Sequence, residues 1–146
     1  MYFFHLAAPG GSQILPINLQ SPYNVKVWAT KDSSGNVRVA VINKDKTYSG
    51  NVRIQLTGYG NGTGLVMSCT NGYGGTLQYV NNTQIANTGI TIAGQTWDGS
   101  TDGTLQGTQS TTSIPAYPVT TGSSSNYYYV PVEPGQAVLM TVTPRS

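Results

Sequence analysis

Three stretches in the first half of the chain alternate apolar and polar residues with a period of two. Valine takes every second position at residues 25–27 and 37–41, and residues 52–56 repeat the pattern with Val, Ile and Leu. This alternation is typical of a strand with one face in a core and the other face in solvent. Polar segments at 31–36 and 43–46 separate the stretches, so we predict an antiparallel meander of three strands.

Composition excludes several other classes of protein. Ser, Thr, Gly and Asn make up 61 of the 146 residues, and charged residues only 8%. Helices depend on Ala, Leu, Glu, Lys and Arg, which are scarce here, and ten Tyr and two Trp supply more burial than a disordered chain has. A net charge of +2 offers no basic patch for nucleic acid, and no apolar run approaches the length of a membrane span.

The rest of the chain is less regular but also favours short strands. The glycine-rich segment 58–64 is predicted to be a turn, and residues 98–113, which carry one large apolar side chain, are expected to be mostly loop. About eight short strands predict an all-β fold, a two-sheet antiparallel β-sandwich. Further strands are predicted at 65–67, 77–79, 90–92, 127–130 and 137–142. The expected core includes Val25, Val27, Val39, Val41, Ile54, Leu56, Val138 and Met140.

The N-terminal segment differs from the remainder. Residues 1–22 are predicted to lead into a sandwich domain at 23–146. The segment opens on an apolar cluster that is too short for a stable free helix but fits the tail of one. No basic residues precede the cluster, so a signal peptide is not expected, and the abrupt aromatic start suggests a chain cut from something longer. The cluster consists of Tyr2, Phe3, Phe4 and Leu6.

Residues with catalytic or metal-binding chemistry are few and scattered. A glycoside hydrolase needs two facing carboxyl groups, yet the carboxylates here lie in turns and loops, where Asp commonly bonds local backbone. Calcium binding at residues 98–102 is an alternative, although the acidic density of a calcium loop is missing. The single Cys69 and single His5 have no partner in sequence, so we expect no catalytic residue, no metal site and no cofactor. The five carboxylates are Asp32, Asp45, Asp98, Asp102 and Glu133.

Aromatic residues are the one feature that suggests a ligand. Sugars stack on exposed Trp and Tyr rings, but the same rings also pack against a second domain or in an ordinary core. Three consecutive tyrosines in one strand must divide between its two faces, so at least one is expected to point outward. The candidate carbohydrate-binding residues are Trp28, Trp97, Tyr127, Tyr128 and Tyr129.

The hairpin segment resembles a known family. Residues 25–45, which end in Val-Ile-Asn-Lys-Asp, the alternating strand 52–56 and the finish Val-Glu-Pro-Gly-Gln-Ala-Val-Leu-Met-Thr-Val at 132–142 resemble the C-terminal β-domain of retaining glycoside hydrolases built on a (β/α)8 barrel. The likeness is greatest to family 79, the β-glucuronidase and heparanase group, and families 30, 39 and 51 have comparable domains. The catalytic glutamates of that family lie on the barrel, and no position here corresponds to them.

The resemblance implies a non-catalytic accessory domain that packs on a missing barrel and stabilises it. Two alternatives remain open, a free-standing carbohydrate-binding module and a surface or adhesin fragment. We expect partners to be the barrel or further copies of the chain, joined through residues 1–20 or a free sheet edge, with a polysaccharide as a further candidate. Tyr2, Phe3, Phe4 and Leu6 are the expected contact residues. Acceptor patterns for glycosylation at Asn61 and Asn81 agree with a secreted, extracellular or periplasmic protein.

Overall fold

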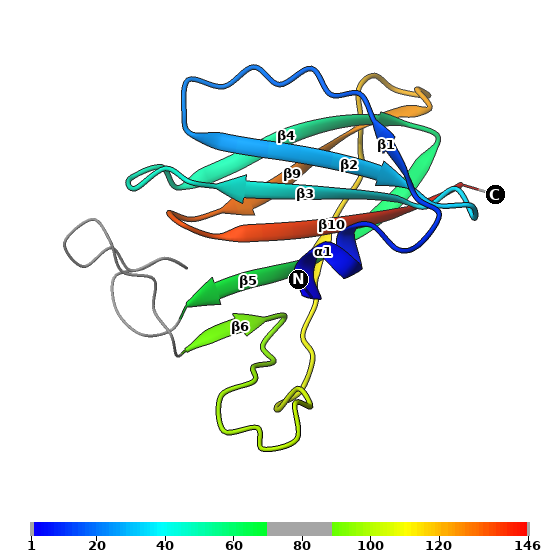
Figure 1. The fold of residues 1–146 in the computed structure, drawn as a ribbon. Helices are drawn as coiled ribbons and strands as arrows, with labels where there is room; N and C mark the ends of the chain where they lie inside the picture. The colour runs from blue at the N-terminus through cyan, green and yellow to red at the C-terminus, as the bar shows by residue number, and fades with distance from the viewer. Residues whose placement is uncertain (1, 70–88, 146) are drawn as a thin grey trace.

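The computed structural model describes residues 2–69 and 89–145, which form one short helix and ten strands (Figure 1). The all-β, antiparallel sandwich predicted from the sequence is confirmed, with more strands than expected. The elements are α1 (Tyr2–Ala7), β1 (Gln13–Leu15), β2 (Val25–Lys31), β3 (Val37–Asn43), β4 (Gly50–Thr57), β5 (Tyr59–Cys69), β6 (Ile90–Ile92), β7 (Thr112–Ile114), β8 (Tyr117–Pro118), β9 (Ser125–Val132) and β10 (Ala137–Pro144).

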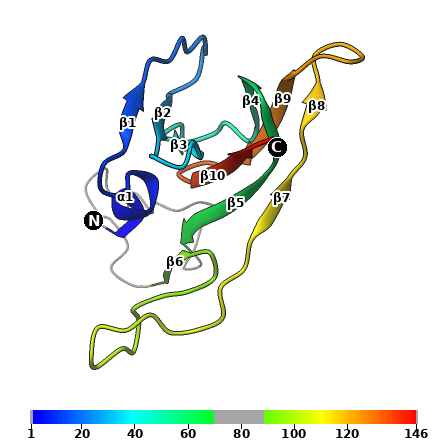
Figure 2. The ribbon, with the colours of Figure 1, turned by 90° about the vertical axis from the view of Figure 1, so that its right-hand side faces the viewer.

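Two antiparallel sheets of unequal size pack face to face (Figure 2). The larger, sheet A, has the order β1-β2-β3-β10-β5-β6, and β7 pairs with the same edge of β5 as β6. The smaller, sheet B, has the order β4-β9-β8. Strand β9 contacts β3, β5 and β10 across the core, so the centre of the sandwich lies between these four strands.

The predicted meander is correct for its hairpin and wrong for its third strand. β2 and β3 pair in register from Val25 opposite Asn43 to Lys31 opposite Val37. β4 then leaves sheet A and pairs with β9, because β10 occupies the second edge of β3. The turn between the hairpin strands contains Gly35, whose φ of 84° lies in the left-handed region that glycine adopts at little cost.

Valine dominates the core between the sheets. Of the predicted core residues, Val25, Val39, Val41, Val138 and Met140 are buried. The other three, Val27, Ile54 and Leu56, pack against this core but are only half-buried. They belong to β2 and β4, next to one open side of the sandwich, which is why they are less covered than their alternation predicts.

A second apolar cluster lies on the outer face of sheet A, under α1. Phe3 and Ala7 of the helix pack with Ala40, Ile92 and Leu139 of the sheet. The hydroxyl of Thr30 donates a hydrogen bond to the carbonyl oxygen of Ala7. The helix therefore covers strands that are apolar on both faces, such as β3, where residues 39–41 are all buried.

Two further expectations meet different outcomes. The glycine-rich segment 58–64 is mainly strand, not turn, since β5 begins at Tyr59. Glycine is needed there because a Cβ on Gly64 would lie 2.9 Å from Cδ1 of Ile114 in the neighbouring strand β7. Residues 98–113 are mostly loop, as predicted. The predicted strand at 77–79 and the acceptor at Asn81 lie outside the described residues, and so does the side chain of Cys69.

Candidate interaction surfaces

The carboxylates of Asp32 and Asp102 stabilise their own turns through local hydrogen bonds. The Asp32 carboxylate accepts a bond from Arg38 at 2.6 Å and two more from Asn36, and the Arg38 bond is the largest cause that lowers the pKa of Asp32 to about 2. Asp102 accepts bonds from the hydroxyl of Thr104 at 2.7 Å and from its N–H at 3.0 Å, which lower its pKa. These are local turn bonds of the kind that Asp commonly makes.

No metal-binding cluster is found in the described ranges 2–69 and 89–145. There, no group of three or more His, Cys, Asp and Glu residues is arranged to hold an ion. Asp98 accepts a bond from the N–H of Gly89, and Asp102 bonds inside its own turn, so the two residues of the calcium alternative are each engaged separately. No helix among the same residues is long and apolar enough to cross a membrane.

Asn43 and Asp45 stabilise the loop in which the chain passes from β3 of sheet A to β4 of sheet B. Both residues belong to the segment that carries the family resemblance. The buried Asn43 amide donates to the carbonyl oxygens of Tyr48 at 2.8 Å and Glu133 at 2.9 Å. Asp45 accepts the N–H groups of Thr47 at 2.9 Å and Tyr48 at 3.0 Å, and these bonds lower its pKa. The Asn-Lys-Asp motif therefore has a structural role, because its hydrogen bonds fix the turn from β3 towards β4.

An apolar patch lies beside α1 on the outer face of sheet A. It consists of Phe4 of α1, Ile14 of β1 and Trp28 of β2, with exposed fractions of 65%, 76% and 57%. These three residues surround a pocket of about 130 Å³ whose walls present no polar atom. A sugar site needs polar groups that fix the orientation of the hydroxyls, so this surface, here called the Trp28 patch, suits a protein partner better.

The four expected contact residues of the N-terminal cluster do not share one surface. Phe3 is buried in the outer cluster of sheet A, and Tyr2 and Leu6 are half-buried against it. Only Phe4 is well exposed and open to a partner. In an amphipathic helix neighbouring residues point to different sides, so Phe3 is buried against the sheet while Phe4 faces solvent. The apolar cluster in the sequence does not reveal which of its residues is buried.

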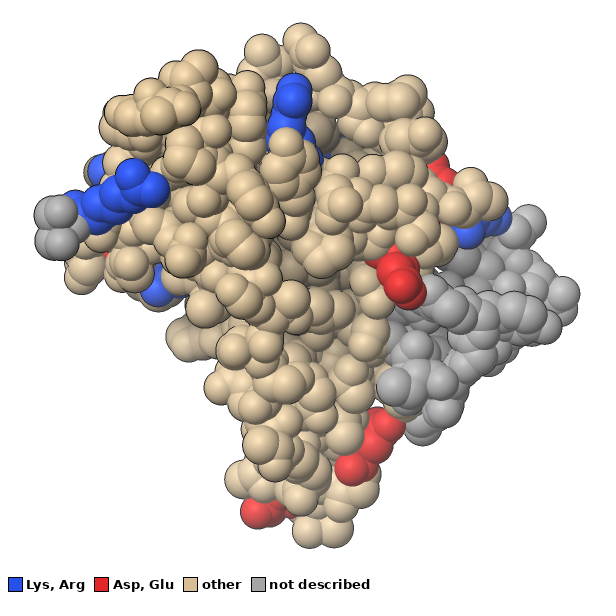
Figure 3. Space-filling view, turned by 180° about the vertical axis from the view of Figure 1, so that it is seen from behind, with Lys and Arg blue, Asp and Glu red and all other residues tan. Residues whose placement is uncertain are grey.

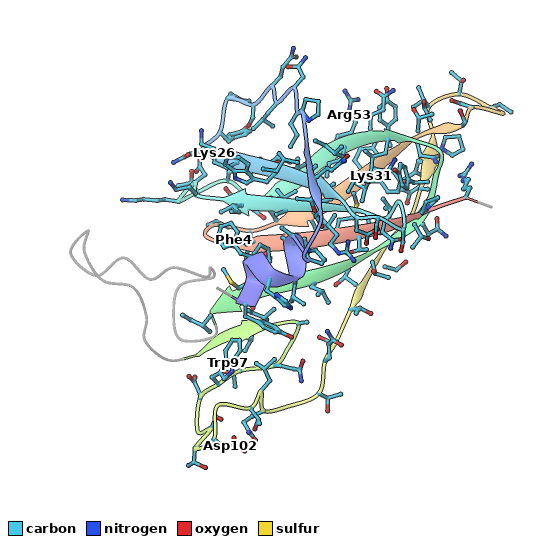
Figure 4. The ribbon with its side chains drawn as sticks, turned by 45° about the vertical axis from the view of Figure 1, so that its right-hand side comes forward. Phe4, Lys26, Lys31, Arg53, Trp97 and Asp102 are labelled. Carbon is cyan, nitrogen blue, oxygen red and sulfur yellow. The ribbon has the colours of Figure 1, made fainter. Side chains whose placement is uncertain are left out.

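Trp97 lies elsewhere and is engaged within the chain. Its ring meets Tyr2 edge to face, with centroids 5.2 Å apart, and its indole N–H donates to the carbonyl oxygen of Gly103 at 3.1 Å. Figure 4 shows Trp97 and Asp102 in the long loop that follows β6, away from Arg53 on β4. The two tryptophans therefore do not form one stacking platform, since Trp28 belongs to the patch on β2.

The three tyrosines of β9 divide between its faces as expected for a strand. Tyr128 is fully buried, which excludes it from any surface site, and Tyr127 and Tyr129 point outward from sheet B. Arg53 of β4 lies over the Tyr127 ring at 4.8 Å, and Tyr117 of β8 meets Tyr129 edge to face at 5.7 Å. This outer face of sheet B combines exposed rings with hydrogen-bond donors, the composition that a sugar site requires.

A cleft opens between the two sheets where β2 faces β4. Its volume is about 480 Å³, and it is lined by residues 15–19, by apolar residues of β2, β3 and β4, and by the polar residues Arg53, Gln55 and Thr57 at the edge of β4. The sequence does not reveal this cleft, because a period-two pattern shows which face of a strand points inward and not whether another strand lies opposite. Ile14, Tyr117 and Arg53 were missed for a related reason, since their neighbours come from distant parts of the chain.

Charges are sparse over the surface. Figure 3 shows single Lys, Arg, Asp and Glu side chains separated by broad uncharged areas on the face seen from behind. Arg38 and Asp32 form a close ion pair at 2.6 Å.

No protein-family model matches the sequence, and no curated protein is significantly similar to it.

Proposed function

We propose that this chain is a non-catalytic accessory β-sandwich domain of a secreted glycoside hydrolase, which docks on a catalytic barrel and stabilises it. The observation that carries the proposal is the Trp28 patch, an exposed apolar surface around a pocket with no polar atom. Patches of this kind mark contacts with other proteins or domains. The resemblance of residues 25–45 to the β-domain of family 79 enzymes supplies the identity of the partner.

The reading frame that encodes the chain gives the first test. A (β/α)8 barrel with two catalytic glutamates upstream of Met1 is expected, and an unrelated domain in that place would contradict the proposal. In the full-length enzyme, Trp28→Ser should lower thermal stability and activity together, because the barrel loses its support. Tyr129→Ser, which removes an exposed ring from the other sheet, is the matched control and should leave both unchanged.

Carbohydrate binding is the second candidate function, and the outer face of sheet B favours it. Tyr129 and Tyr117 are exposed by 43% and 51%, and the Arg53 guanidinium lies over the Tyr127 ring. Titration of the chain with soluble polysaccharides separates the two candidates. Saturable binding that Tyr129→Ser abolishes and Trp28→Ser preserves would favour a binding module, and the accessory domain predicts no binding.

A further inference from the structure

The sandwich is open along one side because its sheets are unequal. In the described residues β4 is the edge strand of sheet B, and β9 is its only strand partner, over eight registered pairs from Gly50 opposite Val132 to Thr57 opposite Ser125. The other edge of β4 therefore has backbone donors and acceptors that no strand pairs. Such an edge is a template for one more strand. Figure 2 shows this side between β2 and β4, and the cleft of about 480 Å³ lies there.

The walls of the cleft are apolar at alternate positions. Val52, Ile54 and Leu56 face it from β4, and Val27 and Ala29 face it from β2. A cavity of about 150 Å³ holds one benzene-sized group, so this cleft has room for about three apolar side chains. The cleft is thus suited to a strand that presents apolar residues at every second position.

The chain itself carries a segment of this kind. Residues 16–22, which we call the arm, join β1 to β2 and project beyond the sheets (Figure 1). Ile17 and Leu19 continue the alternation of Leu15 and are 41% and 39% exposed. Among the described residues, the backbone of 16–20 makes no hydrogen bond to a strand, and no charged residue occurs between Gln13 and Tyr23.

The arm does not fill the cleft of its own copy. It forms part of the wall, and the volume of about 480 Å³ remains with the arm in place. The arm is also fixed at both ends, by the pairing of Leu15 with Ala29 and by Tyr23, whose ring stacks on Tyr48 at 4.0 Å. A strand from elsewhere would lie between this wall and β4.

We propose that two copies of this chain associate by exchanging arms, each arm entering the cleft of the other copy along β4. An exposed apolar arm beside an open cleft with apolar residues at alternate positions is self-complementary, as a two-fold symmetric interface requires. Ile17 and Leu19 of one copy lie among Val52, Ile54 and Leu56 of the other, and the uncharged arm adds no repulsion beside Arg53. The exchange uses the cleft and leaves the Trp28 patch free, so it stands apart from the proposed function.

Sedimentation velocity over a range of concentrations tests the exchange. The unaltered chain should form dimers, and the double substitution Ile17→Lys with Leu19→Lys should weaken association at least about a hundredfold, because it places positive charge among apolar side chains and beside Arg53. Gln20→Lys is the matched control, since it adds the same charge to an exposed residue of the same arm that does not line the cleft, and it should leave the dimer intact. Circular dichroism of each variant checks that the sandwich is folded. A monomer at high micromolar concentration, or a dimer that survives the double substitution, would overturn the proposal.

Crosslinking between labelled copies locates the contact. In a Cys69→Ser background, a copy with Leu19→Cys and a tagged copy with Ile54→Cys are mixed and oxidised. A disulfide-linked product that contains one copy of each supports exchange. If a single chain with both substitutions closes on itself at low concentration and the mixed copies do not link, the arm closes its own cleft and the proposal is wrong.

Discussion

Substitution of Asn43 tests whether the motif of the family resemblance is structural. Asn43 is 1% exposed, and its side-chain amide donates to the carbonyl oxygens of Tyr48 at 2.8 Å and Glu133 at 2.9 Å. Its side-chain oxygen accepts the N–H of Asp45 at 3.1 Å. One side chain therefore joins the loop between β3 and β4 to the loop between β9 and β10.

The magnitude follows from these three bonds. Each typical hydrogen bond adds a net of about 1 kcal/mol to stability, and a buried carbonyl oxygen left without a donor costs about 1 kcal/mol or more. Asn43→Ala removes all three bonds and leaves the Tyr48 carbonyl oxygen unpaired, whereas Glu133 still accepts the N–H of Gln136 at 3.0 Å. We therefore expect the free energy of unfolding to fall by about 3–4 kcal/mol. That is a large part of the stability of about 5–15 kcal/mol that domains have.

Asn43→Asp keeps the shape of the side chain but replaces its NH2 group, a hydrogen-bond donor, with an oxygen that accepts hydrogen bonds. The carboxylate then faces two carbonyl oxygens, and only a protonated carboxyl can donate to one of them, so its pKa is raised in the folded state. The loss of stability should be full at neutral pH, above the raised pKa. It should diminish as the pH falls towards about 4, the ordinary value for Asp, where the folded protein already holds the proton.

Urea unfolding followed by tryptophan fluorescence at pH 7 and about pH 4 measures both effects. Asn51→Ala, at an exposed position of β4, is the control and should change stability by less than about 0.5 kcal/mol. If Asn43→Ala lowers the free energy of unfolding by less than about 1 kcal/mol, the three hydrogen bonds do not stabilise the loop between β3 and β4. The electrostatic reasoning fails if the deficit of the Asp variant is the same at both pH values.

Three further substitutions test separate parts of the fold. Because Arg38 holds the pKa of Asp32 near 2, against an ordinary value of 3.8, the stability that this pair adds is complete above about pH 4 and is lost as the pH falls towards 2; Asp32→Asn should remove that slope in acid unfolding curves. Gly62→Ala places a Cβ 3.0–3.3 Å from atoms of strand β10 and should lower the free energy of unfolding by about 1–3 kcal/mol in urea. Tyr128→Phe removes the buried hydroxyl that donates to Gly60 at 2.8 Å, and calorimetry should show a loss of about 1–2 kcal/mol with an unchanged fold.

Local pattern was sufficient to predict the long strands β2, β3, β4, β9 and β10 but not the short strands β1, β7 and β8, and it failed where a position depends on residues far along the chain. The β2–β3 hairpin follows from alternation and a glycine turn, both of which lie within about twenty residues. The partner of β4 is β9, whose paired residues lie 68 to 82 positions further along the chain, and nothing in residues 52–56 specifies it. The first half of β5 was predicted to be a turn, whereas its second half at 65–67 was correctly predicted as a strand. The glycines of the first half lie against Ile114 and β10, which are distant in sequence.

The candidate surfaces show the same limit. Sequence showed that Tyr127, Tyr128 and Tyr129 divide between two faces, and the structure assigns Tyr128 to the interior. The sequence grouped Trp28 with Trp97 because of their chemistry, whereas the fold separates them onto different elements. Composition identifies which side chains could bind a ligand, but only the packing of distant strands shows which of them share a surface.

Strand β2 takes part in both proposed contacts, and successive residues of the strand separate them. Trp28 points outward into the patch beside α1, and Val27 points inward to the cleft. Since neighbouring residues of a strand face opposite sides, Trp28→Ser should impair the proposed docking on a barrel and leave the association of copies unchanged. Val27→Ser should weaken the dimer in sedimentation and change the stability of the folded chain by about 1 kcal/mol or less, because the residue is half-buried. The double variant should show both losses, since the two side chains point to opposite faces of the strand. A dimer weakened by Trp28→Ser alone would mean that the patch, and not the cleft, joins the copies.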